Sequence, residues 1–389
     1  MKYLSLQKVN YFHFGTIIKT LKKYTYFRIM IITKLSLLNF KNHSERNFEF
    51  STQINCFVGN NGVGKTNILD ALHYLSMAKS FLGNKDLNNI KIDEDFFTIE
   101  GTIDDGEKEN IIKIQQPKEA KKIIKKNDKS YDRIADHIGF LPSVIISPYD
   151  SNLISDSGES RRKFLDAMIS QTDSDYLFNL IQYQKTVQQR NALLKDFSKN
   201  RYFDADNLEI YNEPLIKFGS KIFEKRREFT DSIVPLIQNY YEIISKGKEK
   251  ITVIYESDLS DHNFGTLLDQ NLEKDRMLTY TSKGIHKDDL LFEMNGISMK
   301  RTASQGQQKS FLIALKLSQM NRIKELTGRT PILLLDDIFD KLDDSRVSQL
   351  IELVNQEHFG QIFITDTSRE RTENVVRRIN EESKIFDLS

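Results

Sequence analysis

The chain has 389 residues, enough for two domains or for one large domain that carries an insertion. Its formal net charge of +1 gives no general indication of a nucleic-acid partner, so any contact with DNA must come from local basic patches. The single cysteine, Cys56, excludes an intrachain disulfide and fits a reducing compartment, and no apolar run approaches the length of a membrane span. We therefore expect a cytoplasmic protein without a membrane partner.

Residues 1–29 carry six basic side chains and no acidic one. A basic arm or a targeting peptide is one interpretation, although a secretory apolar segment and cleavage site are lacking. The alternative is a translated A/T-rich segment, because an apolar stretch follows Met30 at once. We predict that residues 1–29 are a non-native or disordered extension and that the protein starts at Met30.

A nucleotide-binding loop is predicted near the start of the remaining chain. Expected strands at 31–40 and 47–50 lead to a short buried strand at 54–58, and apolar residues from Ile68 onward then recur at helical spacing. Between strand and helix the chain reads G-x-x-x-x-G-K-T, the Walker A pattern. The loop consists of Gly59, Asn60, Asn61, Gly62, Val63, Gly64, Lys65 and Thr66.

The residue types of this loop suit ATP and Mg²⁺. Glycines allow backbone N–H groups to turn toward a phosphate, and Lys65 supplies a positive charge for the β- and γ-phosphates. The Thr66 hydroxyl is a ligand for Mg²⁺, and the positive N-terminus of the following helix faces the same anion. Strand, loop and helix together predict a nucleotide site rather than a chance match.

The middle of the chain changes from strands to helices. Residues 96–103 and 111–114 are predicted to form a hairpin. The lysine-rich residues 118–129 are predicted to be a solvated extension of it rather than a DNA contact. Residues 143–147 are predicted to form a buried strand. A capping box at 156–159 opens a helical region that breaks near 199–207, which predicts two antiparallel helices forming an arm. We expect an ATPase lobe at 30–155, a helical insertion at 156–248 and the rest of the lobe at 249–389.

The last third supplies a second acidic element. Strands are expected at 251–255 and 290–294, and a strong helix follows Ser304-Gln305-Gly306-Gln307. An apolar strand at 331–335 then ends in Asp336 and Asp337, as a Walker B element does. Asp336 would hold Mg²⁺ and Asp337 would polarise the attacking water as the catalytic residue. A strand at 362–365 and a closing amphipathic helix complete the prediction.

Several motifs resemble those of the ABC-type ATPases of chromosome maintenance and, more narrowly, the RecF family. They are the Walker A loop with Asn67-Ile68-Leu69-Asp70-Ala71, the segments at 35–42, 161–166, 286–290 and 304–309, and Leu342-Asp343 after Walker B. The resemblance implies an α/β fold: an ABC-type P-loop ATPase head with mixed sheets and an inserted helical arm.

The resemblance also implies site residues and partners. Ser304, Gly306 and Gln307 match the signature motif, which contacts ATP bound to the opposite subunit, and Asp343 matches the D-loop of the same composite site. Lys41 and Asn42 match a position that approaches the nucleotide. The implied protein is a homodimer that forms with ATP on single-stranded, gapped or duplex-end DNA. It would act with other recombination mediators and support recombinase loading, DNA repair, replication and SOS induction.

Some positions depart from the pattern. Thr365-Asp366 stands where ABC-type ATPases have a γ-phosphate switch histidine, the usual Q-loop glutamine is missing near Ser147, and Gly284-Ile285-His286-Lys287 replaces Gly-Pro-His-Arg. We therefore expect weak, DNA-stimulated ATP hydrolysis that acts as a switch. The alternatives are the nucleotide-binding subunit of a transporter, another SMC-like ATPase without a role at gaps, and a P-loop nuclease or kinase.

Overall fold

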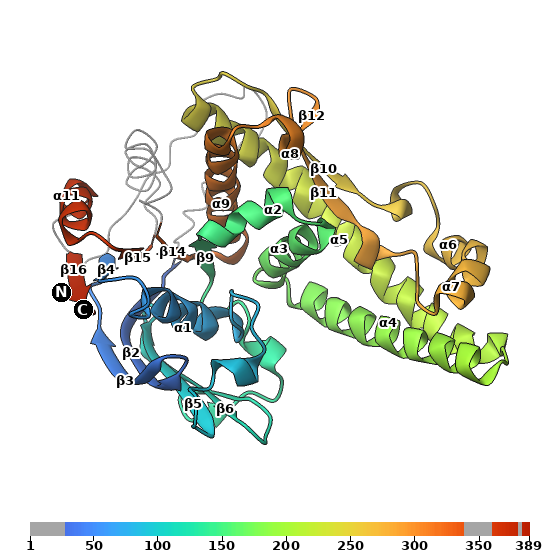
Figure 1. Cartoon of the computed structure of the whole chain (residues 1–389), viewed down its shortest axis with the longest axis horizontal. Helices are drawn as coiled ribbons and strands as arrows, with labels where there is room; N and C mark the ends of the chain where they lie inside the picture. The colour runs from blue at the N-terminus through green and yellow to red at the C-terminus, as the bar shows by residue number, and fades with distance from the viewer. Residues whose placement is uncertain (1–27, 338–359, 380–382) are drawn as a thin grey trace, which may run out of the picture.

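The computed structural model, which describes residues 28–337, 360–379 and 383–389, contains a five-stranded sheet in the left half of Figure 1. The strands of this sheet are all parallel. In spatial order they are β16 (Ser383–Asp387), β4 (Ile54–Val58), β15 (Ile362–Asp366), β14 (Ile332–Leu335) and β9 (Ser143–Ile146). The predicted strands at 54–58, 143–147, 331–335 and 362–365 therefore lie side by side.

The strands β4, β15, β14 and β9 are mostly apolar because both faces of the sheet are covered. Alternate residues of one strand enter different cores, as the two-residue period of a strand requires. Leu333 and Leu335 pack into the core that contains α9 (Gln305–Thr327). Ile332 and Leu334 pack into the core that contains α1 (Lys65–Met77). β4 and β15 likewise contribute to both cores, so the parallel sheet joins the two layers of the molecule.

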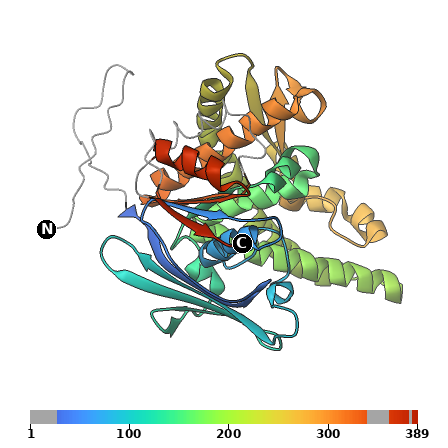
Figure 2. The same cartoon turned by 60° about the vertical axis from the view of Figure 1, so that its left-hand side comes forward.

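A six-stranded antiparallel sheet covers α1. Its spatial order is β3 (His43–Glu49), β2 (Ile31–Phe40), β5 (Phe96–Asp104), β6 (Glu109–Pro117), β7 (Ile123–Lys126) and β8 (Lys129–Ser130). Figure 2 shows this sheet, coloured blue to teal, as a curved layer at the bottom of the view. The helix sits close on it, since a Cβ at Gly101 would lie 2.5 Å from Leu75 Cδ1.

Two details of this sheet differ from the sequence prediction. The second strand begins at His43 rather than near residue 47, because the polar residues 43–47 continue an antiparallel pairing with β2. The lysine-rich segment does form a hairpin, as expected, with Asn127 and Asp128 at its turn in the left-handed region. Asparagine and aspartate tolerate that conformation better than most residues.

Helices cover the other face of the parallel sheet and extend into an arm. α3 (Gly158–Ser170) begins after Ser157 without the side-chain cap bond that the predicted capping box requires. α4 (Ser174–Asn200) and α5 (Ala205–Ser245) form the predicted antiparallel pair, seen on the right of Figure 1. α5 continues beyond α4 and packs on α9, so arm and sheet share one apolar core.

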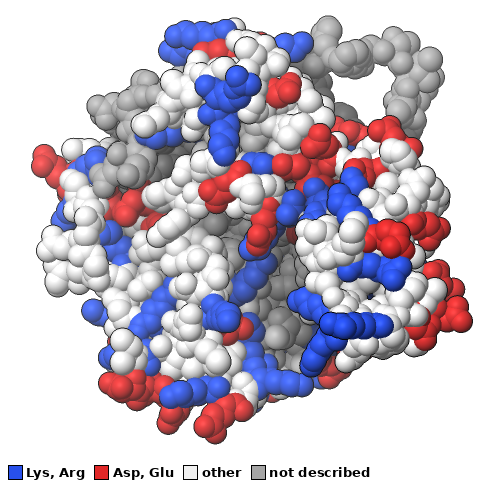
Figure 3. Space-filling model, turned by 45° about the vertical axis from the view of Figure 1, so that its right-hand side comes forward, with Lys and Arg blue, Asp and Glu red and all other residues white. Residues whose placement is uncertain are grey.

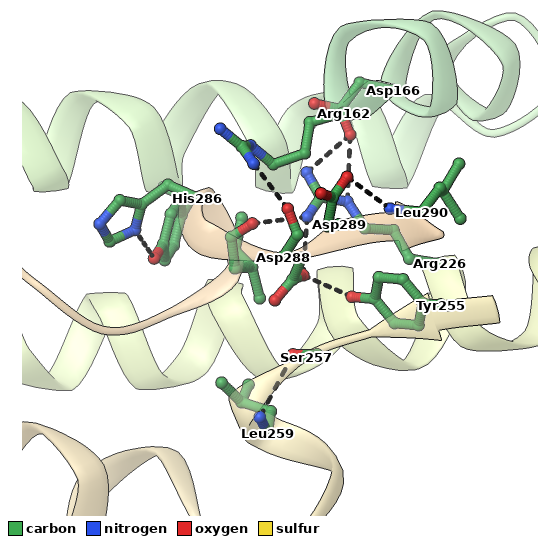
Figure 4. A network of polar contacts seen from close by, with 12 residues as sticks. Arg162, Asp166, Arg226, Tyr255, Ser257, Leu259, His286, Asp288, Asp289 and Leu290 are labelled. Atoms are coloured by element: carbon green, nitrogen blue, oxygen red, sulfur yellow. Dashed lines mark hydrogen bonds and ion pairs between the residues drawn. The ribbon is translucent and has the colours of Figure 1, made fainter. Parts of the chain in front are cut away.

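Two of the motifs that carry the family resemblance meet in a buried polar network (Figure 4). Arg226 of α5 is 1% exposed; it donates to Asp166 of α3, to Asp288 and to the Ile285 carbonyl. Arg161 makes a two-pronged ion pair with Asp289, at 2.7 and 2.8 Å. The segments at 161–166 and 286–290 therefore join α3 and α5 to the start of the strand β11 (Asp289–Met294).

The remaining elements are short. β10 (Ile251–Glu256), β11 (Asp289–Met294) and β12 (Ile297–Ser298) form a small sheet, and β1 (Arg28–Ile29) pairs with β13 (Arg329–Thr330). The short helices are α2 (Asn152–Ser155), α6 (Phe264–Gln270), α7 (Leu272–Leu278) and α8 (Met299–Thr302). Within the described ranges no helix has the length and apolar character needed to cross a membrane.

The expectation that a helix closes the chain is wrong. α11 (Arg369–Ile379) is present, but β16 follows it and pairs with β4 at the edge of the parallel sheet. Phe386 stacks on Phe57 of that strand, with ring centroids 5.3 Å apart. This aromatic contact and the open edge of β4 stabilise a strand that only two strongly apolar residues mark in the sequence.

Candidate functional site

The predicted phosphate loop connects β4 to α1. Gly59, Gly62 and Gly64 have φ values of 151°, 88° and 104°, which side-chain-bearing residues rarely adopt. The Lys65 side chain is 5% exposed and folds back over the loop, where its ammonium group donates to the carbonyls of Gly59 (2.8 Å) and Asn60 (3.0 Å). The sequence thus builds a cationic cradle at the N-terminus of α1.

The Walker B acids stand beside this loop. Asp336 follows β14 and is 3% exposed, and its Oδ1 accepts a hydrogen bond of 2.9 Å from the Thr66 hydroxyl. Burial raises the pKa of Asp336, and the adjacent Asp337 also raises it. A nearby cation would offset this cost of a buried carboxylate.

The oxygen atoms at this point fit Mg²⁺. A hydroxyl and a carboxylate, completed by phosphate oxygens and water, are the hard ligands that Mg²⁺ prefers, and it seldom needs a cage made by the protein alone. Among the described residues no group of three or more His, Cys, Asp and Glu could hold a metal by itself. Thr66 and Asp336 would therefore hold the ion together with the nucleotide.

The turn between β2 and β3 packs against the phosphate loop. Asn42 donates to the Val63 carbonyl (3.1 Å) and accepts from Asn67 (2.7 Å), and a His43 ring nitrogen lies 3.2 Å from the Gly64 carbonyl oxygen. A Cβ on Gly64 would come within 2.7 Å of both Asn42 and His43. Burial lowers the pKa of His43, so this packing favours the neutral ring.

Lys41 and Asn42 take different directions from this turn. The Lys41 ammonium forms a 2.5 Å ion pair with Asp70 of α1, and both side chains are buried. Of these two residues, Asn42 is the one that bonds the loop backbone. The sequence did not reveal the role of His43 or the Lys41 ion pair, because both contacts depend on how β3 and α1 approach each other.

The signature residues lie elsewhere. Ser304 caps α9, with its hydroxyl accepting from the Gln307 backbone N–H (3.3 Å) while the Gln307 side chain accepts from Ser304 N–H (2.7 Å). Gln307 also donates to Glu249 (2.9 Å). In Figure 1 the start of α9, next to α8, is separated from α1 by the parallel sheet. Gly306 shares this end of α9, whereas Asp343 lies outside the described residues.

The end of the chain also approaches the phosphate loop. The backbone N–H of Leu388 donates to the Val58 carbonyl (3.0 Å). A Cβ on Gly59 would lie 3.5 Å from the backbone nitrogen of Ser389. The loop is therefore bordered by the β2–β3 turn and by the residues that follow β16.

Comparisons with known proteins agree with this architecture. The family model described as RecF/RecN/SMC N terminal domain matches residues 31–385. The chain is 52% identical over 359 residues to the DNA replication and repair protein RecF of Flavobacterium johnsoniae, covering 92% of this chain and 100% of that protein. The RecF protein of Phocaeicola vulgatus is 44% identical, with 92% and 96% covered.

Solved structures give the same result. A structure described as the recombination mediator protein RecF-ATPrS in the RecFOR pathway has a TM-score of 0.82 and 31% identity, with 93% of this chain and 97% of that chain covered. A structure of an Smc head bound to the C-winged helix domain of ScpA shares the fold, with a TM-score of 0.51 and 15% identity. The match covers 88% of this chain and 91% of that chain. The predicted ATPase head with its helical arm is thereby confirmed, and the chain belongs to the RecF family of DNA replication and repair proteins.

Proposed function

We propose that this chain is an ATP-switched DNA-binding protein of recombinational repair and replication. The observation that carries the proposal is the separation of two groups of residues. Thr66 bonds Asp336 at the start of α1, next to Lys65, whereas Ser304 begins α9, which the parallel sheet separates from α1. Two copies would then complete each other's sites. Residues 30–155 and 249–389 would form the ATPase head, and 156–248 the arm.

Each side chain near the loop has a proposed part. With ATP bound, the Lys65 ammonium would exchange its two carbonyl partners for β- and γ-phosphate oxygens, and the N-terminus of α1 would stabilise the same charge. Asn42 would hold the loop in shape through Val63. Thr66 and Asp336 would hold Mg²⁺, which supplies charge neutralisation at the phosphates, and Asp337 would polarise the attacking water.

The signature motif would act on the partner's nucleotide. Because the Ser304 hydroxyl accepts a bond from Gln307, its own proton is available to donate to a γ-phosphate. Ser304 is exposed, as such a contact requires, and Gly306 follows without a side chain in the way. We propose that Asp343 joins this composite site.

DNA is the proposed macromolecular partner. The recombination-mediator structure and the RecF relatives point to DNA repair. The net charge of +1 requires that binding use local patches, and Figure 3 shows Lys and Arg side chains along the sides of a furrow in the middle of one face. Phosphate contacts of this kind bind DNA without reading its sequence. We propose that the protein acts in the cytoplasm with other recombination mediators, supporting recombinase loading and SOS induction.

Fluorescence anisotropy with single-stranded, duplex and gapped DNA tests this function. We expect ATP to tighten binding to gapped or single-stranded DNA relative to ADP, with affinity falling steeply as salt rises. Lys65→Ala, which removes the cation at the β- and γ-phosphates, should abolish the ATP effect while leaving nucleotide-free binding unchanged. Equal binding with ATP and ADP would overturn the switch. An ATP effect without preference for any of the three DNAs would instead favour an SMC-like ATPase without a role at gaps.

A further inference from the structure

Thr365 and Asp366 stand where ABC-type ATPases have a γ-phosphate switch histidine, and Thr365 is the one that reaches the Walker B acids. It is the fourth of the five residues of β15 and is completely buried. β15 lies between β4 and β14, with Thr365 paired to Phe57 and the preceding Ile364 paired to Leu335. The side chain therefore stands level with the end of β14, where the two Walker B acids begin.

The Thr365 hydroxyl contacts both acids. It donates its only proton to Asp336 Oδ1 (2.8 Å) and accepts the backbone N–H of Asp337 (2.9 Å). Asp336 Oδ1 also accepts from the Thr66 hydroxyl (2.9 Å). One buried hydroxyl thus links the carboxylate that would bind the metal ion to the backbone of the catalytic residue.

The second contact matters because Asp337 has an unusual backbone. Its φ of 43° lies in the left-handed region, which costs a non-glycine residue conformational energy. The bond from Asp337 N–H to Thr365 stabilises this conformation and so sets the direction in which the Asp337 side chain leaves the backbone. Loss of the hydroxyl would deprive the part-buried Asp337 N–H of this acceptor.

The neighbouring residue is also engaged within the chain. Asp366 is 1% exposed and accepts from the Arg371 guanidinium and from the Thr372 hydroxyl (3.0 Å). The end of β15 is therefore held by intrachain bonds on both sides of the strand, and none of them requires a phosphate.

We propose that Thr365 is a positioning residue of the ATP site, which holds Asp336 and Asp337 in place through its hydroxyl. The inference rests on the proposed ATP-dependent function and adds a residue to it. The end of β15, which carries the γ-phosphate switch histidine in ABC-type ATPases, would here orient the Walker B acids through Thr365.

Thr365→Val removes the hydroxyl at nearly constant shape, and Thr365→Ser restores it. Mutation of a residue that positions a metal ligand typically lowers metal affinity or activity about 10–100-fold. We expect Thr365→Val to raise the Mg²⁺ concentration needed for tight ATP binding at least tenfold and to lower kcat by a similar factor, with KM for ATP in excess Mg²⁺ nearly unchanged. Thr365→Ser should recover most of both losses. Hydrogen exchange at 336–337 in nucleotide-free protein should be faster in the valine variant.

Thr372→Val is the matched control, since Thr372 is an equally buried threonine whose hydroxyl bonds the Asp366 carboxylate. It should lower the unfolding temperature without moving the Mg²⁺ titration. The inference fails if Thr365→Val titrates with Mg²⁺ as the parent does, if serine does not rescue it, or if Thr372→Val has the same effect. Thr365→Ala carries the same expectations should valine prevent folding. Because Mg²⁺-dependent ATP binding is measured on single chains, a failure of dimerisation or DNA binding would leave this test intact.

Discussion

At the scale of one residue, the buried carboxylate of Asp336 suits the proposed ATP site but lowers the stability of the folded chain. This carboxylate is almost fully buried, and burial raises its pKa, so the folded chain without nucleotide disfavours the charged form. A group with a raised folded-state pKa contributes least to stability above that pKa. The negative charge on Asp336, which the proposed Mg²⁺ ion would require, therefore destabilises the nucleotide-free protein at neutral pH.

Asp336→Asn should consequently stabilise the nucleotide-free protein. The amide oxygen still accepts from Thr66 and Thr365, but no charge is buried, and we expect an unfolding temperature about 2 °C higher at pH 7. The difference should shrink as pH falls and the parent carboxyl becomes protonated. Thermal unfolding at several pH values, with and without Mg²⁺-ATP, measures this, and only the parent should gain strongly from the nucleotide. A variant less stable than the parent at pH 7 would contradict the argument.

The phosphate loop and Asp336 could be predicted from sequence because each is set by a local pattern. Glycines at fixed offsets determine the loop, and an apolar strand that ends in acids indicates Walker B. The Lys41–Asp70 ion pair and the Thr365 bonds could not be predicted. Lys41 and Asp70 are 29 positions apart in the chain, and Thr365 of β15 bonds to residues that follow β14. Both sets of contacts depend on how these elements pack against each other.

Elements were predictable to the extent that their apolar patterns are long. The strands β2, β4 and β14 and the pair α4–α5 stand where the patterns place them. β16 was missed because its five residues owe their strand conformation to pairing with β4. The segments at 161–166 and 286–290 were recognised by resemblance alone, and the structure gives them a shared place around Arg226.

Arg226 makes the largest number of bonds in this network and so contributes to the attachment of the arm. Arg226→Ala would leave the Asp288 carboxylate buried and the Asp166 carboxylate half-buried without their cation, and breaking a buried pair in this way typically costs about 3–5 kcal/mol. Denaturant unfolding should show this loss. Arg227→Ala is the control, because Arg227 is exposed and lies over the Phe223 ring, so a change within about 0.5 kcal/mol is expected. Equal losses in both variants would mean that the network does not hold the arm.

At the scale of the whole molecule, the separation of Ser304 from the phosphate loop predicts how copies assemble. Ser304→Arg should leave ATP binding to single chains nearly intact but abolish ATP-driven dimerisation, because a large cation would occupy the proposed interface. Asp337→Asn should give longer-lived ATP dimers by slowing hydrolysis while Asp336 still binds the metal. Light scattering with ATP, ADP and no nucleotide measures both.

Ser260→Arg provides the control for added bulk and charge, since Ser260 is an exposed serine between β10 and α6. It should dimerise as the parent does. If Ser304→Arg also dimerises normally, or if Asp337→Asn dimers are no longer-lived, the chain acts as a monomeric switch instead.

The position of Ser389 has a practical consequence for anyone preparing the protein. The last residues run along β4, and Ser389 lies beside Gly59, the first residue of the phosphate loop. A purification tag or fluorescent fusion attached after Ser389 would emerge next to the nucleotide site and could obstruct ATP or the approach of a second copy. Measurements of nucleotide affinity and assembly are therefore best made with the C-terminal end left unmodified.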